Sequence, residues 1–201
     1  MKFITDITKK KELIKKYCLQ QYMSLDLESI SVLISFERNE YLVQAGTSSA
    51  YLYFVIKGKL SCFSYTSSEK INCVAFSQNS ALIGEASSLF GDAPTVSVKA
   101  LSDVLCVAVC LNEYRESLLN DLTFVRNICH QLARKINNEG RYSTTLLDPL
   151  EVRLSQFILL NSCEGFFTIQ LTDCADALNS SYRHLLRIIK ELCELNILTK
   201  K

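Results

Sequence analysis

The chain has 201 residues, 48% of them hydrophobic, and a formal net charge of +1, which is the composition of a globular protein with a sizeable core. Its longest apolar runs, such as Tyr51–Ile56 and Val104–Leu111, are far too short to span a bilayer, and no apolar signal core follows Met1. We therefore expect a cytoplasmic protein with no membrane partner. The balanced charge also argues against a polybasic tail that binds acidic partners in general.

Nine cysteines are many for a reducing compartment, but no two of them form a C-x-x-C pair. A zinc or iron–sulfur framework is therefore poorly supported. Cys106 and Cys110 lie four residues apart in an expected strand, which separates them by about 13 Å and is too far for a disulfide. We expect most of these thiols to act as small buried hydrophobic groups.

The first half of the chain changes from a helical to a strand pattern. Residues 9–22 place apolar side chains at helical spacing among lysines, which predicts a short amphipathic helix. Short strands separated by turn signals are then expected at 29–36, 41–44, 51–56, 59–65, 71–76, 81–83, 96–100 and 104–109. Strands of this length with no long helix among them predict an antiparallel sandwich or jelly roll.

Catalytic motifs are absent from the sequence. Metal-dependent jelly-roll enzymes need two or three histidines on their strands, whereas the only histidines here, His130 and His184, lie in expected helices. The sequence also has no Walker motif, no G-x-S-x-G and no H-E-x-x-H. The chain is therefore predicted not to be an enzyme.

A long helix is expected at 121–142, after a short polar helix at 111–120. Its apolar residues step by three and four, the a/d spacing of a coiled coil: Leu122, Val125, Cys129, Leu132 and Ile136. We interpret this row as a dimer interface, in which Cys129 faces its symmetry mate. The alternative is that the helix packs on strands of its own chain.

A polar break at 143–148, closed by Pro149, predicts a domain boundary. A helix is expected from Pro149 to about Leu160, and a short strand at Phe166–Gln170. Two further short helices joined by a tight turn are expected within 172–188, which reads TDCADALNSSYRHLLRI.

This stretch has the pattern of a helix-turn-helix. Ala175 is the small residue of the first helix, Asn179 is the turn residue in the left-handed region, and Leu185 with Ile188 joins the two helices. Thr172 is expected to cap the first helix.

Ser180 or Ser181 is expected to begin the second helix. Its outer face carries the candidate DNA contacts: Ser181, Tyr182, Arg183, Arg187 and Lys190. Arg183 and Arg187 are one turn apart, so both guanidinium groups can reach base edges or phosphates. The alternative is a solvated amphipathic helix, since the chain from Tyr142 onward holds six Lys/Arg against seven Asp/Glu.

The order of these parts resembles the CRP/FNR family of bacterial transcription regulators along almost the whole chain. YLYFVIKGKL at 51–60 is similar to the family's strand–Gly–strand signature, and IGEASSLFGDAPTVSVKAL at 83–101 resembles its Gly-Glu effector-pocket segment. More narrowly, SYRHLL at 181–186, FILL at 157–160 and LLND at 118–121 are similar to the YeiL-like branch of that family.

The resemblance implies an α+β fold of three parts. These are a cyclic-nucleotide-binding-like β-roll at 1–120, a dimerisation helix at 121–142 and a winged helix-turn-helix domain at 143–201. It also implies a homodimer that binds double-stranded DNA at a palindromic site in response to a small-molecule or redox signal.

The effector pocket departs from the cyclic-nucleotide-binding pattern. In members that bind cyclic nucleotides, the Glu meets the ribose and an Arg pairs with the cyclic phosphate. Gly84 and Glu85 match, but the Arg position falls at Pro94 or Thr95, so tight cyclic AMP binding is not expected. An iron–sulfur sensor of the family needs an N-terminal cysteine cluster, and only Cys18 precedes residue 60.

The effector is therefore unknown. One redox candidate is a disulfide between Cys62 and Cys73, which face each other across an expected hairpin if its turn lies at 67–68. The wing is expected to be incomplete, with only a first strand at about 197–200.

Two other functions stay open. One is a small-molecule-binding module that acts through protein partners and carries a degenerate helix-turn-helix. The other is a jelly-roll enzyme, against which the lack of histidines in the strands argues.

Overall fold

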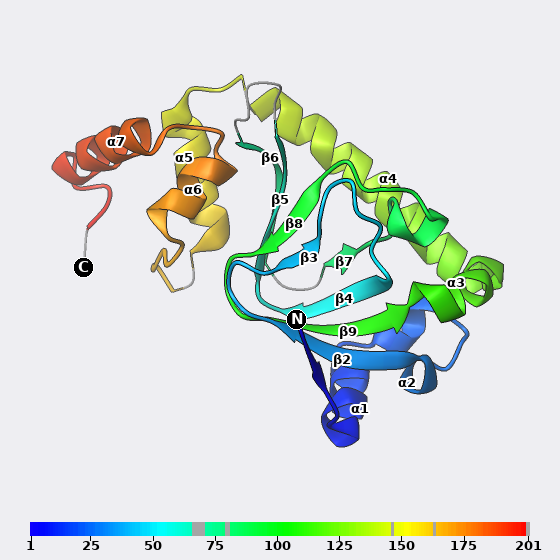
Figure 1. The fold of residues 1–201 in the computed structure, drawn as a ribbon. Coiled ribbons are helices and arrows are strands. Elements are labelled where there is room, and N and C mark those ends of the chain that lie inside the picture. Colours follow the sequence, from blue (N-terminus) through cyan, green and yellow to red (C-terminus); the bar gives the residue numbers. More distant parts are fainter. Residues whose placement is uncertain (66–70, 79–80, 146, 163, 200–201) are drawn as a thin grey trace. The chain divides into compact units, whose positions relative to one another are not determined.

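The computed structural model describes residues 1–65, 71–78, 81–145, 147–162 and 164–199 (Figure 1). The chain forms two compact units. The first consists of residues 1–64 and 74–136, and the second of residues 65–73 and 137–201. None of the helices in the described ranges is both long and apolar enough to cross a membrane.

The β-strands form two sheets whose described pairings are antiparallel. One sheet has the order β1-β2-β9-β4-β7 and the other β3-β8-β5-β6. The strands are β1 (Lys2–Ile4), β2 (Ser31–Phe36), β3 (Tyr41–Val43), β4 (Tyr51–Lys57), β5 (Lys59–Tyr65), β6 (Ile71–Gln78), β7 (Leu82–Ile83), β8 (Ser97–Ala100) and β9 (Val104–Cys110). The expected jelly-roll arrangement is confirmed, with β1 as an additional strand.

Strand β4 shows why its sequence is a continuous apolar run. Leu52, Phe54 and Ile56 pack in a core cluster with residues of the surrounding helices, whereas Tyr53 and Val55 pack in a second cluster that holds residues of both sheets. Both faces of the strand are therefore buried, and a period of two cannot appear in its sequence. β4 and β5 are joined by Gly58 at φ +126°, where a Cβ would come within 2.6 Å of Val104 Cγ2, so no larger residue fits.

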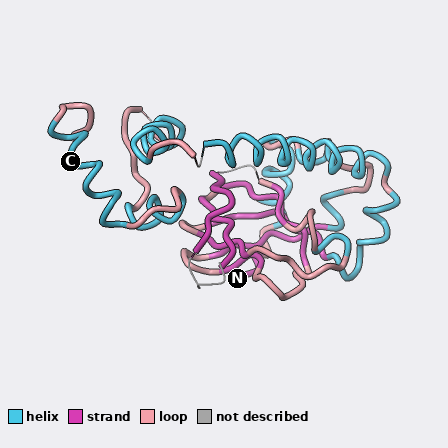
Figure 2. Tube along the Cα trace, turned by 90° about the horizontal axis from the view of Figure 1, so that it is seen from above, coloured by secondary structure: helices cyan, strands magenta, loops and turns pink. Residues whose placement is uncertain are grey.

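The helices of the first part of the chain are α1 (Ile7–Lys16), α2 (Leu27–Ile30), α3 (Leu111–Asn120) and α4 (Leu122–Thr145). The expected helix at 9–22 ends at Lys16 because Cys18 adopts a left-handed conformation, and a 3-10 helix follows at Leu19–Tyr22. Figure 2 shows α4 running beside the strands, and its residues Phe124 and Ile128 belong to the core cluster of the first unit.

Asp121 fixes the start of α4 to the N-terminal segment. Its Oδ2 atom accepts hydrogen bonds from the backbone N–H groups of Ser24 (2.5 Å) and Leu25 (3.1 Å), and Oδ1 accepts from Thr123 (2.9 Å) and Phe124 (3.2 Å). Burial raises the pKa of the Asp121 carboxyl, but the backbone donors of Phe124, Ser24 and Leu25 outweigh it, so the pKa lies below its usual value of 3.8.

Replacing Asp121 by alanine is expected to lower the free energy of unfolding at pH 7 by about 2–3 kcal/mol, because a helix cap is lost and N–H groups that are buried or partly buried lose their acceptor. A folded-state pKa below the unfolded value means that this stabilisation is present above the unfolded pKa and is lost as pH falls through the folded pKa. In urea unfolding at pH 7 and at successively lower pH, the difference in free energy of unfolding between wild type and Asp121→Ala should therefore become smaller. The exposed Asp92→Ala is the control; a gap that stays constant with pH would contradict the role of the charge.

The second unit contains α5 (Leu150–Asn161), α6 (Leu171–Ala177) and α7 (Tyr182–Glu194). Arg153 of α5 donates hydrogen bonds to the carbonyl of Leu178, just after α6 (2.5 Å), and to the carbonyl of Asp148 (3.2 Å). The expected strand at Phe166–Gln170 is wrong, since it contains a single bridge residue, Phe166.

The expected wing strand is also wrong over its described residues, 197–199. Asn196 adopts a left-handed conformation (φ 57°), and the N–H groups of Ile197 and Leu198 bond back to the carbonyl of Leu192 at 2.9 and 3.2 Å. This turn satisfies a free carbonyl at the end of α7 instead of extending the chain. Lys200 lies outside the described residues.

Candidate nucleic-acid interface and sensor pocket

The turn between α6 and α7 has the conformation that the sequence predicts. Asn179 lies in the left-handed region at φ 48°, and the N–H of Ser180 bonds to the carbonyl of Ala175 at 2.9 Å. Ala175 is 3% exposed, so a larger side chain does not fit there. The two helices are therefore joined as the helix-turn-helix pattern requires.

The side chain of Asn179 has a contact that the sequence does not reveal. Within the second unit, its Oδ1 accepts a hydrogen bond from the N–H of Cys73 (2.7 Å) and its Nδ2 donates one to the carbonyl of Cys73 (3.0 Å). Glycine would supply the same backbone conformation but neither hydrogen bond. Cys73 and Cys62, the candidate pair, are not joined by a disulfide in the structure.

Helix α7 begins where the sequence predicts. Ser181 is its N-cap, and its Oγ accepts a hydrogen bond from the N–H of His184 at 3.2 Å. The cap expected for α6 is wrong: that helix starts at Leu171, so Thr172 lies inside it and Gln170 is the cap residue.

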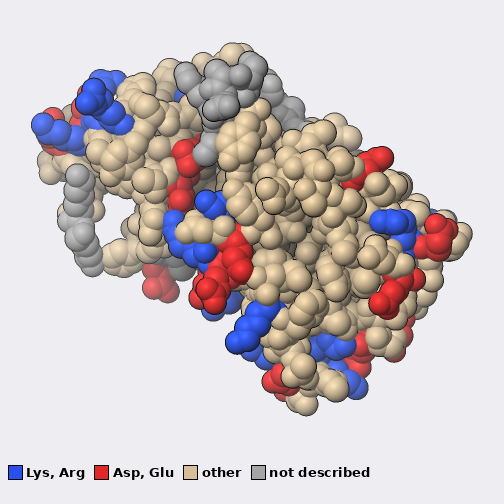
Figure 3. All heavy atoms as spheres, in the orientation of Figure 1, with Lys and Arg blue, Asp and Glu red and all other residues tan. Residues whose placement is uncertain are grey.

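All five candidate DNA contacts lie on the solvent side of α7: Ser181, Tyr182, Arg183, Arg187 and Lys190. On the opposite side, Leu185 and Ile188 are both 0% exposed. In Figure 3 the Lys and Arg side chains gather over α7, with acidic atoms beside them. The helix thus presents a basic face from a backbone that is anchored by its apolar face.

Acidic residues of α7 hold two of these cations. Arg187 pairs with Glu191 at 2.8 Å and Lys190 with Glu194 at 3.7 Å. Exposed i, i+4 pairs contribute about 0.3–0.5 kcal/mol, so a phosphate can replace the glutamate at small cost. Arg183 makes no ion pair with any residue in the described ranges, and its guanidinium is free to contact a ligand.

In the predicted effector-pocket segment, residues 83–101, the backbone comes close to a neighbouring strand at Gly84. This residue lies at φ +100°, and a Cβ would come within 3.0 Å of the Tyr51 carbonyl. Pro94 is buried and its carbonyl accepts a hydrogen bond from the N–H of Gly46 at 2.8 Å, while Thr95 is exposed. Neither position offers a cation to a phosphate.

Glu85 is only 3% exposed, and its partner is a residue that the sequence analysis did not identify. Lys135 of α4 donates from Nζ to the Glu85 carboxylate and to the carbonyl of Leu82, the latter at 3.0 Å. The two charged residues lie 50 positions apart, so no local pattern could have paired them.

Helix α4 carries two apolar faces. Phe124 and Ile128 face the core and are 0% and 4% exposed. The predicted interface row lies on another face, where Leu122 is 61% exposed, Ile136 is 67% exposed and Cys129 is exposed. The remaining members, Val125 and Leu132, are partly buried, and Leu132 packs against the core cluster.

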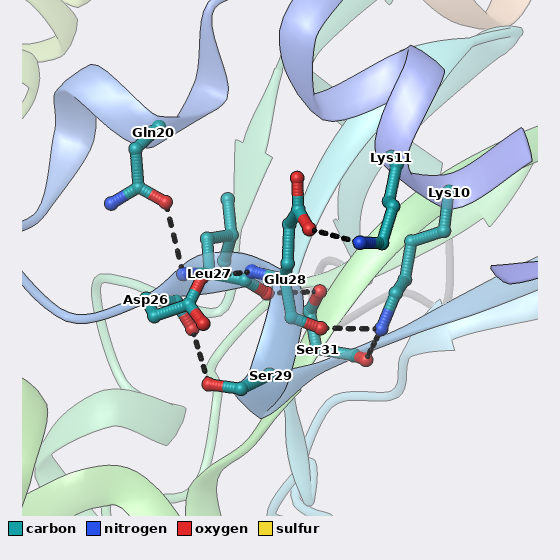
Figure 4. Close-up of polar contacts among 8 residues, drawn as sticks. All are labelled: Lys10, Lys11, Gln20, Asp26, Leu27, Glu28, Ser29 and Ser31. Atoms are coloured by element: carbon teal, nitrogen blue, oxygen red, sulfur yellow. Dashed lines mark hydrogen bonds and ion pairs between the residues drawn. The ribbon is translucent and has the colours of Figure 1, made fainter. Parts of the chain in front are cut away.

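A cavity of about 400 Å³ lies elsewhere in the first unit, beside α1. Its lining residues are Ile14, Lys15, Cys18, Gln20, Gln21, Asp26 and Glu28. Next to it, Lys11 pairs with Glu28 at 3.0 Å, and Lys10 donates to the carbonyls of Glu28 (2.7 Å) and Ser31 (2.6 Å) (Figure 4). These lysines hold α1 to α2 and to the start of β2, which gives this cluster a structural role.

Comparison with known proteins agrees with this arrangement. Residues 33–121 match the cyclic nucleotide-binding domain. Regulatory protein YeiL of Escherichia coli O157:H7 is 29% identical over 177 residues, which cover 87% of this chain and 80% of that protein.

Two solved structures have a similar fold. FixK2 from Bradyrhizobium japonicum superposes with a TM-score of 0.72 at 17% identity, covering 86% of this chain and 89% of the other. The c-di-GMP-responsive regulator CLP of Xanthomonas campestris gives a TM-score of 0.72 at 14% identity, with 95% of each chain covered. The domain match, the relative and the shared fold support a regulator of the CRP/FNR family.

Proposed function

We propose that this protein is a homodimer that reads a palindromic DNA site with two copies of α7. The observation that carries the proposal is the amphipathic recognition helix: Arg183, Arg187 and Lys190 face solvent above a fully buried face at Leu185 and Ile188. Such a helix enters the major groove with its N-terminal residues on the base edges. Because a bacterial chromosome lies in the cytoplasm, a protein that binds it acts there.

The recognition chemistry follows from the side chains. Arg183 is in the first turn of α7, where a guanidinium group can bond the O6 and N7 atoms of guanine. Arg187 and Lys190 exchange their glutamate partners for phosphates, and Tyr182, 47% exposed, donates to a phosphate. Ser181 positions the helix through its cap.

Dimerisation is supported by the uncovered apolar row on α4, which includes Leu122, Cys129 and Ile136. A two-fold pair of helices covers this row and sets the two recognition helices about 34 Å apart, one turn of DNA. The dimerisation helix is residues 121–142 in this proposal, between the sensing β-roll at 1–120 and the DNA-binding domain at 143–201. A signal in the β-roll acts by favouring one orientation of the DNA-binding domains over another.

The signal is not expected to be cyclic AMP. Pro94 and Thr95 give the cyclic phosphate no cationic partner, and Lys135 already holds Glu85. Isothermal titration of the dimer with cyclic AMP should show no binding in the micromolar range. A micromolar or tighter dissociation constant would contradict this picture of the pocket.

Selection of fragments from a bacterial genome on the purified protein tests the proposed function. We expect a small set of fragments to be enriched over a control without protein, with a shared inverted repeat. The competing function is a regulatory module that acts through protein partners. It is supported by the near-neutral charge of residues 142–201. Fragment recovery that matches the control across low and high salt would favour it.

A further inference from the structure

The charged pair Glu85–Lys135 joins the predicted effector-pocket segment (residues 83–101) to α4. The Glu85 side chain is 4% exposed, whereas that of Lys135 is 43% exposed. A buried carboxylate without a cation is strongly disfavoured, while a lysine on the surface loses little when it points into water. Loss of the contact therefore weighs mainly on Glu85.

Lys135 lies near the end of the part of α4 that belongs to the first unit. The residues of α4 that face the core recur every three or four positions, at Phe124, Ile128 and the half-buried Gln131, and Lys135 continues this row. The first unit ends at Ile136, one residue later. Along this row, Lys135 supplies the last contact before the chain leaves the first unit.

Other contacts hold the beginning of the helix. Asn127 donates from Nδ2 to the carbonyls of Gln21 (3.2 Å) and Tyr22 (3.1 Å), and Gln131 donates to the hydroxyl of Tyr22 (3.3 Å). Together with the Asp121 cap, these contacts keep the first three turns of α4 in place without Lys135. The last turn of this segment depends on Glu85 and Leu82.

We propose that Lys135 is a built-in ligand of the sensor pocket and that its bond to Glu85 is a latch on the end of α4. The closed latch satisfies the buried carboxylate and holds the helix up to the unit boundary without any added molecule. The latch opens when a small molecule presents its own cationic or hydroxyl donors to Glu85, because Lys135 is then released to solvent. Binding of a ligand at the pocket thereby loosens the end of this helix segment.

Hydrogen exchange measured by mass spectrometry tests the latch without any DNA. Lys135→Met and Glu85→Gln should each raise amide exchange about tenfold or more in a peptide spanning 130–137, because the last turn opens more often. Peptides from β4 and β9 should keep wild-type rates. Arg134→Met, which removes an exposed cation one residue away, is the matched control and should change nothing.

Two double variants keep the test decisive if Lys135→Met destabilises the domain. Glu85→Gln combined with Lys135→Met leaves no unpaired buried charge, and it should show the same local increase in exchange. The reversed pair, Glu85→Lys with Lys135→Glu, should return the peptide toward wild-type rates. Wild-type exchange in the neutral double variant, or an equal rise across every strand, would overturn the proposal.

Discussion

Replacing Arg183 and Arg187 together by alanine is expected to abolish recovery of specific DNA while leaving the fold unchanged. Each arginine that contacts a base or phosphate contributes about 1–3 kcal/mol, so the double variant should lose about 2–6 kcal/mol of specific affinity. Both side chains are exposed and anchor no core residue, so the midpoint of thermal unfolding should move little. Fluorescence anisotropy with a labelled selected fragment measures the loss.

The control for this variant is the double replacement of Arg126 and Arg134 by alanine, which removes the same charge from exposed positions of α4. It should retain specific binding. Lys190→Ala should weaken binding to all sequences alike and lower the salt dependence by about one counterion. Equal affinity of wild type and the Arg183, Arg187 variant for the selected fragment would remove α7 from the interface.

Cys129→Arg combined with Ile136→Arg is expected to convert the dimer into monomers. The change places like charges across the two-fold axis and removes apolar surface from the interface, so the dimer dissociation constant should rise by roughly 100-fold or more, about 2.7 kcal/mol. In sedimentation equilibrium, the variant should have the mass of one chain, 22.7 kDa, and the wild-type protein should have twice that mass. Ile136 is 67% exposed, so the fold should tolerate the change.

His130→Arg is the matched control, because His130 is exposed on α4 outside the apolar row. It should leave the dimer intact. A wild-type protein that sediments as a monomer, or a Cys129, Ile136 variant that remains dimeric, would show that this face is not the interface.

The sequence predicted those features that depend on neighbours along the chain. Turn residues and apolar runs placed the strands, and α3 begins at Leu111 and ends at Asn120 as expected. The expectation that most of the cysteines are buried is wrong, since only three of the eight in the described ranges are buried: Cys73, Cys106 and Cys174. Burial raises the pKa of Cys106 to about 12, and burial together with the nearby charge of Asp173 raises that of Cys174 to about 12, so both behave as apolar groups.

Contacts between distant residues were not predictable from one sequence. Lys135 meets Glu85 across 50 positions, and Asn179 meets Cys73 across 106. The periodicity of apolar residues in a sequence does not indicate which distant side chains meet after folding. Strand β1 was also missed, because its three residues are too few to show a period.

Helix α4 illustrates a limit of pattern analysis. The a/d row stays a predicted interface, and Phe124 and Ile128 form a second row that packs in the core of the first unit. Packing on the chain's own core and an open apolar face, first set against each other as alternatives, occur together on different sides of one helix. A single heptad row cannot show this, since it describes only one side.

Hydroxyl-radical footprinting of wild-type protein on a selected fragment tests the central claim most directly. Two copies of α7 in successive major grooves should protect two patches on one face of the DNA, about 34 Å apart and related by a dyad. The Arg183, Arg187 variant should lose both patches together. A single protected patch, or uniform protection without a dyad, would contradict recognition of DNA by a two-fold pair of helices.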